Sequence, residues 1–169
     1  MASENAEPWL RGTLTDVDSI SRAVLHALEL AAEDIAKWCD PLNGDELEAT
    51  PLDLPSVGFH IRHIARSLDR LLTYAEGQQL SERQLKALKA EKDFIDREAT
   101  LMEFAEAIEV SVRRVRAFTP AHYDYARGVG RKKLPTTVGG LLVHVADHTQ
   151  RHVGQAVTTS KIVIAMRPK

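Results

Sequence analysis

The sequence predicts an all-α protein, a four-helix bundle with long crossover connections, from three observations. Four separate stretches carry apolar residues at three- and four-residue steps, the period of amphipathic helices. Prolines and glycines separate these stretches, and no two segments of alternating polarity indicate paired strands. Two of the joints are roughly 15 residues or longer, which allows crossovers in place of short connections between neighbouring helices.

The composition is that of one soluble domain spanning residues 1–169. Hydrophobic residues make up 44% of the chain and charged residues 27%, and the formal net charge is −2. This charge gives no electrostatic basis for binding nucleic acid or a membrane surface. The chain has neither an apolar run of about 20 residues, the length that crosses a bilayer, nor a signal-peptide pattern, so we expect a cytoplasmic protein. A single cysteine, Cys39, excludes an intramolecular disulfide and a cysteine-rich zinc site.

The four helical stripes begin and end at recognisable signals, after a loose lead-in at residues 1–15. Ser56, a capping residue, begins the second helix, and Thr136 or Thr137 begins the fourth, each just after a proline. The turn sequence at 40–44 ends the first helix. Together the stripes predict core helices at residues 16–38, 56–77, 100–119 and 136–159.

The remaining segments differ from the stripes in composition. We expect irregular structure at 41–55, which holds three prolines, and a short, mostly solvated extra helix at 81–92, which is rich in Lys, Glu and Gln. The run at 120–135 is interpreted as a surface loop, and its basic cluster Arg131-Lys132-Lys133 as solvated. The segment 160–169 is expected to be a tail with some strand propensity.

The most informative stretch is a row of histidines in the fourth predicted helix. His144, His148 and His152 follow one another at four-residue intervals. On a helix such neighbours lie one turn apart, about 6 Å along the axis and roughly 40° around it. Adjacent members can therefore bind one metal ion, and histidine is the commonest metal-binding side chain. The spacing favours a metal site over isolated core histidines.

The apolar stripe of the fourth helix directs part of this row toward the core. On a helical wheel His152 lies inside the stripe and His148 at its edge. His144 and Gln155 lie further round the same side. An unpaired imidazole nitrogen is costly in a core, so a metal, a water network or a partner side chain has to satisfy these rings.

A further pair, His60 and His63, lies in the second predicted helix. His60 is closer to the apolar stripe, whereas His63 lies on its flank beside Ser67 and Tyr74. Periodicity alone therefore leaves open which of the two is turned toward the fourth helix.

Two windows of the sequence resemble the DinB-like superfamily, four-helix-bundle proteins with metal sites that include the YfiT-type branch. The more specific window lies in the last helix and the other in the second. They read Leu-Leu-x-His144-x-x-x-His148-x-x-x-His152-x-Gly-Gln155, and Ser56-Val57-Gly58 followed by His63.

The resemblance implies a ligand set of His63, His148 and His152 around one divalent transition metal ion, with nickel or zinc expected. It also implies a bundle with unusual helix order and a homodimer. His144 matches a family histidine outside the ligand set and is interpreted as part of the pocket wall or as a neighbour of the ligands. His60 has no family role, and we expect it to be packed or solvent-facing.

Other side chains near the row are candidates for the pocket. Gln155 and Arg151 lie close to His152, and the Gln155 amide is placed to bind a ligand by hydrogen bonds. Asp147 and Asp69 are candidate carboxylates for orienting an imidazole.

Three neutral imidazoles leave a divalent ion with at least one free position, as in catalytic zinc sites. We therefore expect a metal-dependent enzyme acting on a small molecule, and the resemblance points to S-transfer from a low-molecular-weight thiol. The alternatives are a metal-dependent hydrolase and a non-catalytic metal-binding or stress-associated interaction protein. The His-Glu-x-x-His of zincin proteases, a Gly-rich phosphate loop and the Glu-x-x-His pairs of di-iron bundles are all absent from the sequence.

Overall fold

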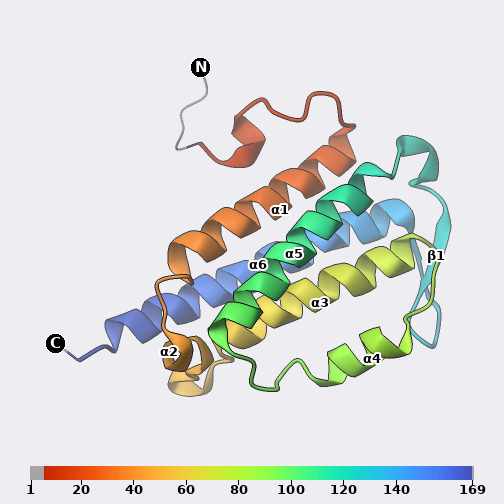
Figure 1. Cartoon of the computed structure of the whole chain (residues 1–169). Coiled ribbons are helices and arrows are strands. Elements are labelled where there is room, and N and C mark those ends of the chain that lie inside the picture. Colours follow the sequence, from red (N-terminus) through yellow and green to blue (C-terminus); the bar gives the residue numbers. More distant parts are fainter. Residues whose placement is uncertain (1–5, 169) are drawn as a thin grey trace.

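Four long helices form the bundle in the computed structural model, which describes residues 6–168 (Figure 1). They are α1 (Ser19–Trp38), α3 (Val57–Ala75), α5 (Arg97–Arg116) and α6 (Val138–Ala165). α1 packs against α5 and α6, and α3 packs against the same two helices. α1 and α3 therefore occupy opposite corners of the bundle, as do α5 and α6. The predicted all-α four-helix bundle is confirmed.

The three connections between these helices differ in how they cross the bundle (Figure 1). The first joins opposite corners at one end and contains α2 (Gly44–Glu48) and a 3-10 turn (Pro51–Asp53), where irregular structure is predicted. The third joins opposite corners at the other end. Only the second, between α3 and α5, runs back along the length of the bundle, and it carries α4 (Glu82–Lys89). The two long joints at which the sequence allows crossovers both connect helices at opposite corners, and the lengthwise crossover between α3 and α5 is an additional one.

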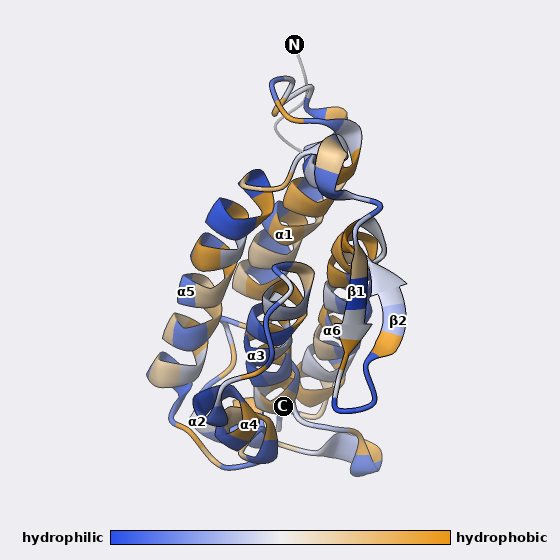
Figure 2. Ribbon diagram, turned by 90° about the vertical axis from the view of Figure 1, so that its right-hand side faces the viewer, coloured by the Kyte–Doolittle hydropathy of each residue, from blue (hydrophilic) through white to orange (hydrophobic). Residues whose placement is uncertain are grey.

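The third connection contains a short antiparallel hairpin instead of the predicted surface loop. Its strands are β1 (Ala126–Val129) and β2 (Leu134–Thr137), and Gly130 at the turn has a φ of +71°. The strands have four residues each, too few for alternation to be detected in the sequence. The turn, blue in Figure 2, carries the exposed basic cluster Arg131-Lys132-Lys133, which is solvated as expected.

Each bundle helix begins at a side chain that caps its first turn. Asp18, Ser56, Asp96 and Thr137 each accept a hydrogen bond from a backbone N–H two or three residues ahead. The predicted starts of the second and fourth helices at Ser56 and Thr137 are confirmed. The first and third helices begin elsewhere than predicted because Asp18 and Asp96 are the caps that the apolar pattern did not reveal.

The last helix continues beyond its predicted end at 159, through most of the expected tail to Ala165. Two contacts with the end of α1 explain this. The Ser160 hydroxyl donates to the carbonyl of Trp38, and Lys161 Nζ lies 4.1 Å from the centroid of the Trp38 ring. Tertiary packing here outweighs the strand propensity of the segment.

Near the other terminus, residues 1–5 of the expected lead-in, like Lys169 of the tail, lie outside the described residues. Pro8–Leu10 form a 3-10 turn. Arg11 then pairs with Glu29 and Glu33 of α1 at 2.9 and 2.5 Å. Within residues 6–168, no helix is both long and apolar enough to cross a bilayer.

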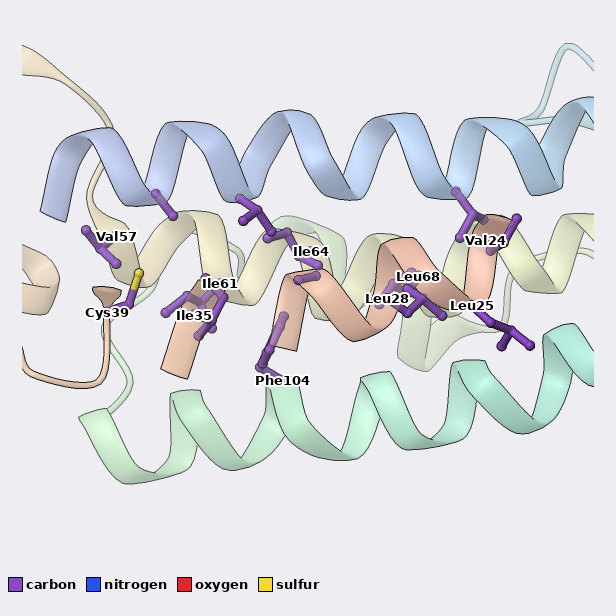
Figure 3. Close-up of a cluster of buried hydrophobic side chains, with 14 of the residues drawn as sticks. Val24, Leu25, Leu28, Ile35, Cys39, Val57, Ile61, Ile64, Leu68 and Phe104 are labelled. Carbon is purple, nitrogen blue, oxygen red and sulfur yellow. The ribbon is translucent and has the colours of Figure 1, made fainter. Parts of the chain in front are cut away.

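The core fills the space between the four helices (Figure 3). Its side chains are aliphatic apart from Phe104 and Cys39, and they come from every bundle helix. Cys39, just after α1, is buried and free among them, and burial raises the pKa of its thiol to about 12. The central members include Val24, Leu28, Ile61, Ile64, Leu68, Phe104, Leu142 and Val145.

One charged pair lies at the edge of this core. The Arg62 side chain is 1% exposed and donates to both carboxylate oxygens of Glu48, at 2.5 and 3.0 Å. Gly58 makes room for this pair, because a Cβ at that position would overlap Glu48 Oε1 and lie 2.9 Å from Arg62 Nη1. A buried guanidinium is tolerated only while it is paired, so the absence of a side chain at Gly58 supports the pair.

We expect Gly58→Ala to lower the free energy of unfolding by about 1–3 kcal/mol, the cost of leaving a buried donor unpaired. Urea unfolding followed by circular dichroism measures the change. Gly154→Ala in α6 is the matched control, since a Cβ there meets nothing within 4 Å; it should raise stability by about 0.5–1 kcal/mol. Equal effects of the two variants would contradict this role of Gly58.

Candidate metal centre

Three imidazoles meet between α3 and α6. His63 comes from α3, and His148 and His152 come from successive turns of α6. One nitrogen from each ring can be chosen so that all three lie within 4.8 Å of one another. The Nε2 atoms of His63 and His148 are 3.3 Å apart. Nitrogen donors in a tetrahedral zinc site, with bonds of about 2.0–2.1 Å, lie about 3.3–3.4 Å apart, so this pair has the spacing that one ion requires.

Partners on the other ring nitrogens indicate which atoms are free to bind. His63 Nδ1 lies 2.8 Å from Glu91 Oε2. His152 Nδ1 lies 3.2 Å from Nδ1 of His60. With these Nδ1 atoms engaged, Nε2 is the nitrogen that remains for a metal in both rings. In His63 this atom faces His148 Nε2 and also lies 3.4 Å from the Ser67 hydroxyl. Phe59 stacks on the His63 ring, with centroids 5.5 Å apart and an interplanar angle of 19°, and so restricts its rotation.

Burial disfavours a charge on two of the convergent histidines. Together with repulsion by neighbouring imidazoles and by Arg151, it lowers the pKa of His148 and of His152 to about 4. The pKa of His60 also falls to about 4, first through burial and then through repulsion by His152 and His63. At neutral pH these rings therefore keep the lone pairs that a metal ion needs.

The structure places His60 inside the protein, against the ligands. It is buried and contacts His152, so of the two expected alternatives, packed or solvent-facing, the first is correct. His60 also borders a cavity of about 300 Å³ together with Arg151 and Gln155, two of the residues predicted to contribute to a pocket. Leu54 and Pro55 of the first connection complete one wall.

His144 lies on the outer side of the row. Its side chain is 47% exposed, and its ring centroid lies 5.5 Å from that of His148. Asp147 lies 3.8 Å from His144 Nδ1 and pairs with Arg151 at 2.5 Å. These three side chains form an exposed group beside the three convergent imidazoles.

The carboxylate that reaches a convergent imidazole is Glu91, and neither aspartate considered from the sequence does so. Asp147 contacts His144 and Arg151, and Asp69 accepts hydrogen bonds from Gln84 and Arg114. Burial alone would raise the pKa of the Glu91 carboxyl, but hydrogen bonds from His63 and Arg70 outweigh it and hold this pKa below its ordinary value. Glu91 therefore carries a negative charge next to His63.

The sequence did not indicate a role for Glu91, because this residue lies in the segment predicted to be mostly solvated. It belongs to the crossover, just after α4, and is buried. Its position depends on an arginine row on α3, formed by Arg62, Arg66 and Arg70. The four-residue spacing of this row is visible in the sequence, but the spacing does not reveal which acid the arginines bind.

The donor set fits a divalent transition ion. Imidazole nitrogens suit zinc, nickel, copper and iron alike, and the three rings reach one point from two helices that pack side by side. Among residues 6–168 no fourth His, Cys, Asp or Glu joins the cluster. A bundle of this kind belongs to the class of helical proteins with a three-histidine cluster between two helices.

The chain belongs to the DinB superfamily, whose family model matches residues 27–156. The matched region contains all three convergent histidines and Glu91. The expected family membership is confirmed. No curated protein matches the chain. The expected homodimer, the cytoplasmic location and the identity of the metal stay predictions.

The lowered pKa values of His60, His148 and His152 predict how stability depends on pH. Their folded-state pKa values of about 4 lie below the ordinary value of 6.5, so between these limits the unfolded chain binds more protons. Stability of the metal-free protein should therefore be full above pH 6.5 and fall as the pH decreases toward 4.

Thermal unfolding in the presence of a chelator, between pH 7.5 and 4, measures this dependence. A His148→Gln, His152→Gln variant should show a shallower decline, because two of the responsible groups are gone. A decline of equal steepness in the variant would attribute the effect to other groups.

Proposed function

We propose that this chain is a metal-dependent enzyme that acts on a small molecule at the three-histidine centre, by S-transfer from a low-molecular-weight thiol. The observation that carries the proposal is the convergence of three imidazoles, two of them with pKa values lowered to about 4, without a fourth protein ligand among the described residues. Such a donor set leaves a coordination position for substrate, as in catalytic rather than structural zinc sites. Nickel or zinc is the proposed ion.

A divalent ion at this position supplies Lewis acidity and lowers the pKa of a thiol or water that reaches it. The protein's own part is to hold the rings neutral and oriented. His60 and Glu91 engage the second nitrogens of two of them. Phe59 covers one face of His63.

The cavity of about 300 Å³ beside His60 supports a small substrate. Arg151 and Gln155 offer hydrogen-bond donors along its wall, and Leu54 and Pro55 offer an apolar surface. The Arg151–Asp147 pair is more than half exposed, so Arg151 can exchange this partner for an anionic group of a substrate at small cost.

In the proposed reaction the thiol sulfur forms a bond to an electrophilic carbon, the leaving group departs with its electron pair, and the thiol proton passes to solvent. The thiol as reactant is supported by the resemblance of the two histidine windows to a superfamily that includes thiol-dependent transferases. The hydrolase alternative uses the same centre with water as the nucleophile. The non-catalytic alternative requires a closed site, whereas His148 and His152 are only partly buried.

We expect elemental mass spectrometry to find about one equivalent of a transition metal in the untagged protein. His63→Ala, His148→Ala and His152→Ala should each lose it, because two imidazoles and water bind a divalent ion far more weakly. His144→Ala is the matched control from the same row and should keep its metal. Loss of metal in this control, or retention in the other three variants, would contradict the ligand set.

Catalysis is tested by following conjugation of small thiols to a chromogenic haloarene. We expect turnover that a chelator abolishes and that added zinc or nickel restores, with a loss of at least about 100-fold in His148→Ala, because the bound ion would lower the pKa of the attacking thiol. Hydrolysis of activated esters without thiol conjugation would favour the hydrolase. A chelator that lowers the unfolding temperature, with no turnover on either substrate class, would favour the non-catalytic protein.

A further inference from the structure

Glu91 is held from several directions at once, although it lies in a connection and not in a bundle helix. Arg70 Nη1 donates to its Oε1 at 2.6 Å, and Arg62 Nε donates to its backbone carbonyl at 3.4 Å. Its remaining carboxylate oxygen, Oε2, faces His63 Nδ1 at 2.8 Å. The carboxylate therefore has little freedom to turn away from the imidazole.

The arginine row fixes the segment that carries Glu91. Arg66 donates to the carbonyls of Ala87 and Ala90, at 3.2 and 2.8 Å, at the C-terminal end of α4. Backbone N–H groups of Ala90 and Asp93 also donate to these two carbonyls, at 3.2 Å each. Arg66 adds side-chain hydrogen bonds to the end of α4 and so ties the crossover to α3. Its guanidinium also pairs with Glu103 of α5 at 2.7 Å.

A carboxylate in this position selects one form of the imidazole. Because an ionised carboxylate only accepts hydrogen bonds, the neutral His63 ring has to carry its proton on Nδ1. Its lone pair then lies on Nε2, the atom that faces His148 Nε2 at 3.3 Å. Metal-binding histidines commonly donate their second N–H to such a partner, which fixes the tautomer and makes the ligand more basic.

We propose that Glu91 is a positioning residue of the metal centre. The arginine row places its carboxylate next to His63, where it holds the ring in the Nδ1–H tautomer and so directs Nε2 toward the proposed metal position. The inference rests on the proposed metal site and adds to it a group from outside the two ligand-bearing helices. Arg70 has a part in it as well, because it occupies Oε1 and donates to Ser67 at 2.9 Å, next to His63 on α3.

The test compares two variants that each neutralise one acid bound to the arginine row. Glu91→Gln removes the charge next to His63, and Glu103→Gln removes a charge that pairs with Arg66 without touching an imidazole. Zinc affinity is measured by competition with a chromogenic chelator. Long-range ¹H–¹⁵N correlation on the metal-free protein reads the tautomer of His63 directly.

We expect Glu91→Gln to bind zinc about 10–100-fold more weakly, the usual effect of losing such a partner, and to show a mixture of His63 tautomers where the wild type shows Nδ1–H. Glu103→Gln should match the wild type in both measurements, even if both variants unfold at a lower temperature. Equal losses of affinity in the two variants, or a wild-type His63 protonated on Nε2, would overturn the inference.

Failure of the proposed function has a different signature. If the wild type binds neither zinc nor nickel, the proposed metal site is contradicted. The tautomer of His63 alone then decides the role of Glu91. A wild-type Nδ1–H form that Glu91→Gln loses still supports positioning of the ring. A tautomer that the variant leaves unchanged overturns it.

Discussion

The guanidinium of Arg62 is the group on which the rest of the structure depends. A charge with almost no access to water is stable only when its donors are all engaged. Glu48 of α2, Thr100 of α5 and the carbonyl of Glu91 engage them. One side chain of α3 thus joins the first connection, a neighbouring bundle helix and the crossover. The next residue along α3 is His63. The hydrogen bonds of Arg62 and the three-histidine cluster therefore share one helical turn.

The three convergent histidines lie close together in a partly buried site between α3 and α6. Burial and Coulomb repulsion by neighbouring groups together disfavour a positive charge on His148 and His152. Packing of α3 against α6 holds them there, with His60 and Phe59 filling the space around the rings. A cation at the centre would be attracted to the imidazole nitrogens of the folded protein. Its binding free energy would therefore add directly to the stability of the fold.

The local parts of this arrangement were predictable and the distant parts were not. Helical periodicity and capping residues were sufficient for the four bundle helices, and four-residue spacing was sufficient for the row on α6. The place of His63 in the ligand set was predicted from the family resemblance, because periodicity did not decide between His63 and His60. Glu91 was out of reach, since its burial depends on arginines more than 20 residues away. The extension of α6 past residue 159 was missed for the same reason, as its contacts are with Trp38.

Among residues 6–168, the carboxylate that contacts the three-histidine cluster comes from the crossover, whereas the histidines come from bundle helices. The histidines lie on helices whose length and register are constrained by contacts with two neighbours each. The connection between residues 76 and 96 has fewer such constraints, and connections tolerate insertions and exchanges better than packed helices. Changes in this segment alone could therefore alter the hydrogen-bond partner of His63 while the three imidazoles keep their places in the bundle.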